Sequence, residues 1–342
     1  MESKKYKPIF SVIVIAFNRR EFIKSAIDSV LNQTLDKTLF EIIVIKNFKD
    51  QEIDDYINLK KITNIISEDI SLGGKLIQAT ESTQGKFISI LEDDDFFNIQ
   101  KLEFLNKYVS EDVCYIHNGF ERRYVDKTES QREESPYFLS GGEPLICQNK
   151  TLKCASNMSS ANAFFNCSSI TISRDLLLKY KEIIKKITFQ LDAFLFMIAF
   201  SDRRKLIHLP HKLTSFREHD YSIDDNDTYE HFKLKKMGRT LKILEEKRMI
   251  VDSFNSRIPR YMLYGDILYL KSTLKIFNVD AGKTSFQEKI FSLFPRPPYT
   301  THFFKLKIIF IGFCPAKIRE RAGLRIYKNA LRKRNLLKNG QI

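Results

Sequence analysis

Apolar runs and amphipathic helical patterns alternate over the first hundred residues of the chain. The runs at 10–15, 41–45 and 87–91 contain almost only apolar or β-branched residues, which is typical of strands buried on both faces. Apolar positions recur at helical spacing over 22–31 and again over 73–83, which predicts one helix after the first strand and another before the strand at 87–91. This order of elements predicts an α/β fold with a Rossmann-like, mostly parallel central sheet flanked by helices.

Polar residues follow each of these predicted strands. They are the turn at 16–19, the pair Lys46-Asn47, and the run Glu92, Asp93, Asp94 and Asp95. Ligands of open α/β sheets bind outside the carboxyl ends of the strands, so we expect these residues to converge on one site. Adjacent carboxylates are too costly to bury without a compensating charge, and hard oxygen ligands of this kind suit Mg²⁺ or Mn²⁺. A solvated acidic turn without a function is the alternative interpretation.

The pattern changes further along the chain. Residues 126–160 are polar and rich in turn-forming residues, which predicts a long binding loop or lid. An apolar run returns at 167–172, and a very apolar helix starts beside Asp192. The last third is mainly helical and basic, so we expect one domain over 1–227 and a helical C-terminal region over 228–342.

Positive charge is concentrated near the C-terminus. The chain has a formal net charge of +14, from 56 lysines and arginines against 42 acidic residues. Between 315 and 338 there are nine basic residues and one acidic residue, and an apolar stripe is formed by Ile318, Ala322, Ile326 and Ala330. A basic amphipathic helix of this kind predicts docking on an anionic membrane surface. Nucleic-acid binding is disfavoured because no recognised binding module accompanies the charge, whereas a solvated packing helix stays open.

The sequence gives no signal for crossing a membrane or for secretion. No window approaches 18 uninterrupted apolar residues, and the first residues lack the apolar core of a signal peptide. We therefore expect a cytoplasmic protein that is peripheral at the cytoplasmic face of the membrane.

Three stretches of the chain resemble the GT-A fold glycosyltransferases of family 2. They are FSVIVIAFNR at 10–19, GKFISILEDDDFFNIQKLE at 85–103 and FREHDYSID at 216–224, and they occur in the family's order. The resemblance implies that 1–227 is a GT-A catalytic domain, which binds a UDP- or GDP-sugar together with Mg²⁺ or Mn²⁺. It also implies inverting transfer of the sugar to a hydroxyl group of a glycan or lipid-linked acceptor.

The resemblance also implies roles for individual residues. Asp192 corresponds to the general base that takes the proton of the acceptor hydroxyl, with a plain helix N-cap as the alternative role. Asp94, Asp95 and His219 correspond to residues at the metal. The implied donor-binding residues are Ala16, Phe17, Asn18, Arg19, Glu92, Asp93 and Arg217. Lys75 joins them as an expected diphosphate contact, because it lies near a predicted helix N-terminus and such termini attract anions.

Four residues at three sites depart from the family pattern. Lys46-Asn47 stands where the family has an acidic pair that reads the nucleobase, although the Lys46 cation and the Asn47 amide can still bond to a carbonyl-rich base or a phosphate. Glu92 replaces an aspartate, and Leu191 replaces a glutamate. Two alternative functions stay open. One is a nucleotidyltransferase that uses the same acidic metal site, and the other, because of the departures at Lys46-Asn47 and Leu191, is a catalytically inactive relative that acts as a binding subunit.

Overall fold

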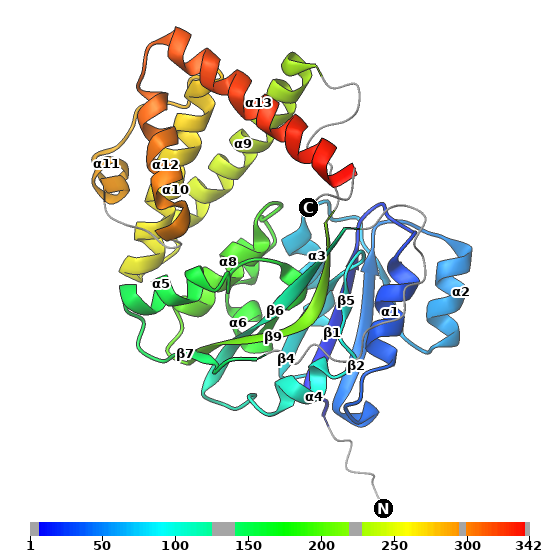
Figure 1. The fold of residues 1–342 in the computed structure, drawn as a ribbon. Coiled ribbons are helices and arrows are strands. Elements are labelled where there is room, and N and C mark those ends of the chain that lie inside the picture. The colour runs from blue at the N-terminus through cyan, green and yellow to red at the C-terminus, as the bar shows by residue number, and fades with distance from the viewer. Residues whose placement is uncertain (1–6, 125–140, 219–227, 294–298, 339–342) are drawn as a thin grey trace, which may run out of the picture. The chain divides into compact units, whose positions relative to one another are not determined.

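The computed structural model describes residues 7–124, 141–218, 228–293 and 299–338. It divides into two compact units. Unit 1 comprises residues 1–150 and 161–217, and unit 2 comprises residues 151–160 and 218–342. Figure 1 shows the sheet that organises unit 1 and the helices of unit 2.

The sheet of unit 1 has a parallel half and an antiparallel half. Its strand order is β3-β2-β1-β4-β8-β6-β9-β5, with β7 beside β9. The parallel half consists of β1 (Phe10–Ala16), β2 (Phe40–Lys46), β3 (Thr63–Ile66) and β4 (Phe87–Glu92). The remaining strands are β5 (Phe96–Phe97), β6 (Val113–Tyr124), β7 (Leu145–Cys147), β8 (Ile170–Ser173) and β9 (Lys205–Glu218). Three of the parallel strands, β1, β2 and β4, are those that the apolar runs predicted. Strand β8 joins β4 antiparallel, so the sheet as a whole is mixed.

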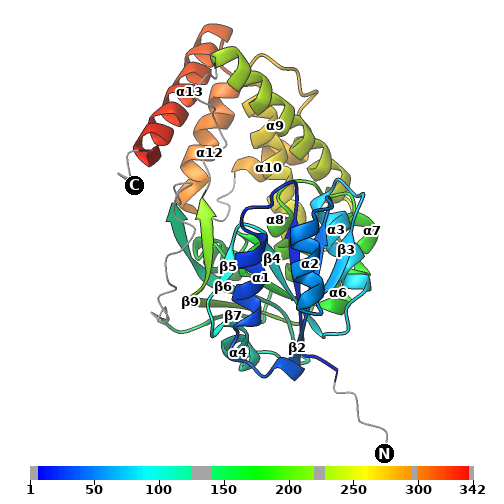
Figure 2. The same cartoon turned by 90° about the vertical axis from the view of Figure 1, so that its right-hand side faces the viewer.

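The helices between the parallel strands cover both faces of the sheet (Figure 2). They are α1 (Ile23–Leu31), α2 (Gln51–Leu59) and α3 (Leu72–Glu81). Phe10, Val12 and Val14 of β1 belong to one buried cluster with residues of α1 and α2. Residues of α3 are absent from that cluster, because a right-handed return from β3 to β4 carries α3 across the opposite face.

Shorter helices complete unit 1. They are η1 (Lys37–Leu39), α4 (Lys101–Asn106), η2 (Cys167–Ser169), α6 (Arg174–Lys179), α7 (Lys181–Ile184) and α8 (Leu191–Phe200). The last of these is the very apolar helix expected beside Asp192, and all seven of its residues from Phe194 to Phe200 are buried. This burial explains why the helix lacks a polar face.

The expectation of a continuous loop over 126–160 is wrong in its second half. Residues 125–140 lie outside the described residues, but β7 and α5 (Leu152–Ser160) are regular elements. Helix α5 buries Ala155, Ser156, Met158 and Ser159, so small hydroxyl side chains occupy part of its packed face. Serine favours turns over helix interiors, so the sequence alone predicts a loop here. The helix forms because these serines are packed on its buried face.

Unit 2 is a set of helices around α10. Besides α5 it contains α9 (Tyr229–Val251), α10 (Arg257–Ile276), α11 (Phe286–Leu293), α12 (Tyr299–Gly312) and α13 (Ala316–Lys338). Helix α10 contacts α9, α11, α12 and α13. Its buried Lys271 forms an ion pair with Glu288 of α11, with Nζ 2.7 Å from Oε1. Within the described part of the chain, no helix is long and apolar enough to cross a membrane.

Replacing Gly73 tests the close approach of α3 to α7. A Cβ atom at Gly73 would lie 1.8 Å from the carbonyl oxygen of Ile184, so Gly73→Ala must push the two helices apart. We expect Gly73→Ala to lower the free energy of unfolding by about 1–3 kcal/mol in urea titrations followed by circular dichroism. The control is Gly238→Ala in α9, where an added Cβ meets no atom within 4 Å and should stabilise the helix by about 1 kcal/mol. An unchanged midpoint for Gly73→Ala would contradict the packing described.

Candidate functional site

The candidate site lies where the order of the parallel strands reverses direction. The chain passes from β1 to β2 and β3 on one side, and then returns to β4 on the other side of β1. Ligands of open α/β sheets bind at such a switch point, beside the carboxyl ends of the strands. Ile15 of β1 is opposite Glu92 of β4, and the Asp93 N–H donates to the Ile15 carbonyl at 3.1 Å. The acidic run is therefore beside the turn that follows β1.

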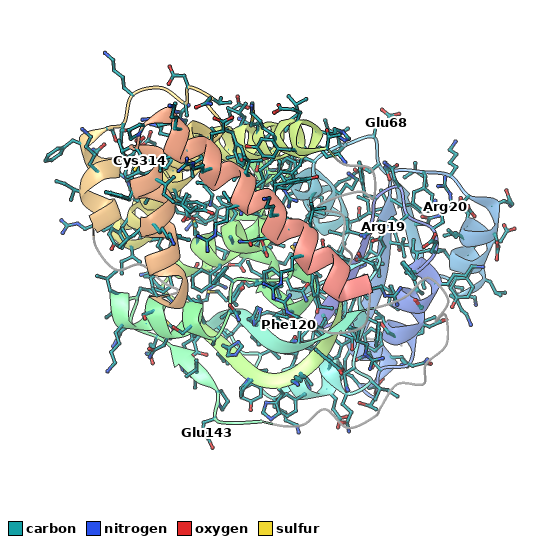
Figure 3. The ribbon with its side chains drawn as sticks, turned by 45° about the horizontal axis from the view of Figure 1, so that its top comes forward. Arg19, Arg20, Glu68, Phe120, Glu143 and Cys314 are labelled. Carbon is teal, nitrogen blue, oxygen red and sulfur yellow. The ribbon has the colours of Figure 1, made fainter. Side chains whose placement is uncertain are left out.

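Arg19 joins the two chain segments at the switch point. Its Nη2 lies 2.5 Å from Oδ1 of Asp93, and its Nη1 donates to Oδ2 of Asp94. Figure 3 labels Arg19 beside the blue N-terminal strands. The turn that presents Arg19 depends on Asn18, whose φ of 58° lies in the left-handed region that asparagine tolerates. The predicted residues of the first turn and of the acidic run thus come together.

Burial is the largest cause of the raised pKa values in the acidic run. Burial raises the pKa of Asp93 to about 6, although the neighbouring Arg19 charge acts in the opposite direction. Burial, followed by the charge of Asp94, raises the pKa of Asp95 to about 7. Burial and the charges of the neighbouring acids also raise the pKa of Glu92 well above its usual range. Bringing a cation to this site would favour the ionised carboxylates.

Lys101 is a buried lysine near the acidic run, and sequence reasoning gave it no role. Its side chain is fully buried, and Nζ donates to the Ser168 carbonyl at 2.6 Å and to Thr214 Oγ1 at 3.1 Å. Burial lowers the pKa of Lys101 well below its usual range, and the charge of Asp95 partly opposes that shift. The available signal was the position of Lys101 four residues before Leu105, on the face of α4 that is buried.

Arg217 and Asp95 meet at the opposite side of the acidic run. The Arg217 backbone N–H donates to Asp95 Oδ1 at 2.8 Å, while the guanidinium lies 3.7 Å from the centre of the Phe22 ring. Among the described residues, Asp95 Oδ2 and the Nε and Nη1 atoms of Arg217 are buried without a hydrogen-bond partner. A carboxylate oxygen and guanidinium N–H groups left open in this way fit a cation and an anionic group.

The metal prediction rests on fewer residues than the sequence suggested. Among the residues that the structure describes, no three His, Cys, Asp or Glu side chains converge on one metal position. His219 lies outside the described residues. Asp94, which is 9% exposed, and Asp95 with its open Oδ2 supply oxygen ligands of the type that Mg²⁺ and Mn²⁺ prefer. Mg²⁺ is commonly held by one or two carboxylates plus substrate phosphates, so two ligands fit this kind of site.

Asn18 and Asn47 form a pair at the ends of β1 and β2. The Asn18 N–H donates to Asn47 Oδ1 at 2.9 Å, and Asn47 Nδ2 donates to Asn18 Oδ1 at 2.8 Å. The expectation that Lys46 reaches a ligand is wrong. Its fully buried Nζ lies 2.8 Å from Asp54 Oδ1 and 2.6 Å from the Phe48 carbonyl, so its charge is used inside unit 1.

Phe17 and Lys75 lie together at the edge of the site. Ala16, the last residue of β1, is buried, whereas the Phe17 ring is 46% exposed. The Phe17 N–H lies 3.3 Å from Asp93 Oδ2, and its ring centre lies 4.6 Å from Lys75 Nζ. Lys75 is only 1% exposed, and Ser71 caps α3 by accepting from the Gly74 N–H. The ammonium group of Lys75 thus packs against an aromatic ring. Its contact with a diphosphate stays a prediction.

Asp192 is held at the start of α8. Its Oδ2 accepts the Asn166 N–H at 3.0 Å, and its Oδ1 accepts the Ala193 N–H at 2.8 Å. The residue before the helix is Gln190, so Asp192 belongs to the first turn and is not the N-cap. The charge of Asp192 is among the smaller causes that raise the pKa of Glu92, which brings the predicted base and the acidic run into one site.

Comparison with known proteins matches the region that carries these residues. The family model described as glycosyl transferase family 2 matches residues 11–171. An uncharacterized glycosyltransferase of Rickettsia typhi is 30% identical over 146 residues, which is 41% of this chain and 43% of the relative. The chain thus spans less than half the length of this curated relative.

Two solved structures share the fold. TarS 1–349 of S. aureus in complex with UDP has a TM-score of 0.51 at 16% identity, covering 90% of this chain and 82% of that one. A mannosyltransferase from Pyrobaculum calidifontis, in complex with GDP-Man and Mn²⁺, has a TM-score of 0.51 at 11% identity, covering 98% and 84%. These likenesses confirm the predicted α/β fold of GT-A type with a helical C-terminal region. Residues 11–171, just under half of the chain, therefore match glycosyl transferase family 2.

Proposed function

We propose that the chain is an inverting glycosyltransferase, which moves a sugar from a nucleotide-diphosphate sugar to a hydroxyl group of a glycan or lipid-linked acceptor. The observation that carries this proposal is the buried acidic run at the switch point, flanked by Arg19 and by the open N–H groups of Arg217. Carboxylates and guanidinium groups side by side suit a metal-bound diphosphate, because each charge type pairs with one part of it.

The donor's diphosphate would lie between Arg217 and the acids. Asp94 and Asp95 would hold Mg²⁺ or Mn²⁺, which, when bound, stabilises negative charge on the nucleoside diphosphate leaving group. Arg217 would donate from Nε and Nη1 to the phosphate oxygens, and Glu92 and Asp93 would face the ribose. The Pyrobaculum calidifontis mannosyltransferase was solved with GDP-Man and Mn²⁺, which supports a donor and a metal of this class.

The nucleobase would meet the asparagine pair. Asn47 uses one acceptor site and one N–H on Asn18, so a second lone pair and a second N–H remain for a base. Uracil and guanine each offer a ring N–H beside a carbonyl, and both match this amide. TarS was solved with UDP and the mannosyltransferase with GDP-Man, so binding must decide between the two bases.

Asp192 would act as the general base. The acceptor hydroxyl would give its proton to the Asp192 carboxylate while its oxygen forms a bond to the anomeric carbon. The bond between that carbon and the phosphate oxygen breaks, and its electron pair leaves with the nucleoside diphosphate. Attack from the side opposite the leaving group inverts the configuration. Two backbone N–H groups hold the two oxygens of the Asp192 carboxylate in place.

We further propose that unit 2 docks on an anionic membrane surface. Phe310 of α12 is 72% exposed, Phe313 just after α12 is 56% exposed, and Ile318 at the start of α13 is 48% exposed. Exposed Lys317 and Arg321 lie on the same short stretch of chain. Apolar side chains beside cations fit the boundary between lipid headgroups and acyl chains.

Nucleotide binding tests the donor site. We expect calorimetric titration to show Mn²⁺-dependent binding of UDP or GDP, abolished by EDTA and weakened at least about tenfold by Asp94→Asn, because a ligand oxygen and its charge are lost. Asp55→Asn, an exposed aspartate on α2, is the matched control and should bind as the wild type does. Failure of both nucleotides to bind with metal present would refute the donor site. Release of pyrophosphate from a nucleoside triphosphate and a sugar phosphate would instead indicate a nucleotidyltransferase, and binding without turnover an inactive relative.

The pH dependence of metal binding follows from the raised pKa of Asp95, which is about 7. A metal ligand must be ionised, so protonation competes with the metal below that value. We expect Mn²⁺-dependent nucleotide binding to strengthen as the pH rises from about 5.5 to 8 and to release protons, measured by calorimetry in buffers of different ionisation enthalpy. Affinity that stays level over this range, or falls, would contradict the assignment.

Vesicle sedimentation tests the membrane proposal. The chain should bind phosphatidylglycerol vesicles and not neutral phosphatidylcholine vesicles, and Phe310→Ser with Phe313→Ser should weaken binding about tenfold or more through lost apolar burial. Leu234→Ser on α9, which removes a side chain that is 63% exposed, is the control and should leave binding unchanged. Equal binding to both vesicle types, or preference for nucleic acid over vesicles, would overturn the proposal.

A further inference from the structure

A buried histidine pair lies behind the proposed base. His117 of β6 is fully buried, and His208 of β9 is 6% exposed. Their Nδ1 atoms are 3.0 Å apart, and the ring centres are 5.2 Å apart in a stacked arrangement. The Nε2 atom of His117 lies 2.8 Å from the Phe165 carbonyl oxygen. Neither side chain has a role in the proposed transfer reaction.

The hydrogen bonds fix the tautomers of both rings. The Phe165 carbonyl can only accept, so His117 Nε2 carries the hydrogen. Burial lowers the pKa of His117 to about 3 and that of His208 to about 4, so both rings are neutral at neutral pH. His117 Nδ1 is then a lone pair, and His208 Nδ1 must donate to it. The pair therefore forms a directed chain of hydrogen bonds that ends at the Phe165 carbonyl.

The Phe165–Asn166 peptide connects this chain to Asp192. Its carbonyl accepts from His117, and its N–H, which belongs to Asn166, donates to Asp192 Oδ2 at 3.0 Å. A peptide unit is planar and rigid, so holding the carbonyl also sets the direction of the N–H. His117 and Asp192 thus contact the two ends of one rigid group.

The backbone conformation of Asn166 is unfavourable and must be stabilised by contacts with other residues. Asn166 has φ 71° and ψ 106°, a region that L residues rarely adopt. Its side chain is fixed as well, since Oδ1 accepts the Ser168 N–H at 3.0 Å and Nδ2 lies 3.2 Å from Ser169 Oγ. The Phe165 ring packs 5.5 Å from that of Phe120, which Figure 3 labels. These contacts hold the segment on one side, and His117 holds it on the other.

We propose that His117, oriented by His208, is a positioning residue that fixes the Phe165–Asn166 peptide and through it the Asp192 carboxylate. The inference deepens the proposed function and rests on it through the role of Asp192. With Oδ2 held by Asn166 and Oδ1 held by Ala193, the carboxylate keeps one orientation while the acceptor hydroxyl approaches. Partners of this indirect kind orient the residues that touch the reacting atoms.

Two substitutions at His117 separate the hydrogen bond from simple packing. His117→Gln keeps an N–H donor within reach of the Phe165 carbonyl, whereas His117→Leu fills the space without a donor. We expect His117→Leu to lower kcat for release of nucleoside diphosphate about 10- to 100-fold, a usual range for such indirect partners, and His117→Gln to recover most of it. KM for the donor and the Kd for the nucleotide should not change, because none of the proposed donor contacts is made by His117, His208 or the Phe165–Asn166 peptide. Equal losses in both variants, or a change in nucleotide Kd, would reduce His117 to a packing residue.

A double-mutant cycle tests the route through Asp192. If His117 acts by orienting Asp192, then His117→Leu should cost little further activity in an Asp192→Asn background. Additive losses would overturn the inference. Thermal unfolding of each variant identifies a general loss of folding. Asn166→Gly is a second variant of the same segment. It tolerates a positive φ but removes the side-chain contacts of Asn166.

Measurements without turnover separate this inference from the proposed function. In the ¹⁵N-histidine-labelled chain, NMR should show one neutral ring protonated at Nε2 and another protonated at Nδ1, assigned by the His117 and His208 variants. The Asp192 carboxyl ¹³C shift should change in His117→Leu and return toward the wild-type value in His117→Gln. An Asp192 signal insensitive to His117→Leu would refute the positioning role, whether or not the chain turns over a nucleotide sugar. Absence of turnover with an intact NMR response would refute only the proposed function.

Discussion

Neutralisation of the buried carboxylates after β4 is the constraint on which unit 1 depends. Asp93 and Asp95 are almost completely buried, and a buried charge without a partner is strongly destabilising. The partners come from three places: Arg19 from the turn after β1, Lys101 from α4, and the backbone N–H of Arg217 at the end of β9. These contacts come from distant parts of the chain, which ties the integrity of the site to the fold of the whole unit.

The same constraint shapes the two sides of the site. The parallel half supplies the Asn18–Asn47 pair and the acids, which are the groups suited to a nucleotide and a metal. The antiparallel half supplies Arg217, and the segment before β8 carries Asn166, which contacts the proposed base. Lys46 belongs to neither side, because Asp54 and the Phe48 carbonyl hold its charge inside the protein. The nucleobase would therefore be read by neutral amides where the family pattern has acids.

Polar contacts between distant segments recur throughout unit 1, and they differ in how precisely their atoms must be placed. The Arg19 contacts are between opposite charges, so moderate changes in distance leave an attraction. The chain from His208 through His117 to the Phe165–Asn166 peptide is made of neutral groups, and it depends on the position of each hydrogen. Charge pairs can hold the acidic run together, but only directional bonds can orient a single carboxylate such as Asp192.

The sequence by itself determined three of the four parallel strands, helices α1 and α3 and the acidic run, because apolar periodicity and adjacent charges are local properties. It also pointed to the family through motifs with fixed spacing. The burial of Lys46 and Lys101, the helix α5 and the histidine pair were decided only by the tertiary structure. Each of these depends on a partner far along the chain, as when Lys101 meets Ser168 and His117 meets His208, and no local pattern encodes which distant groups will be brought together.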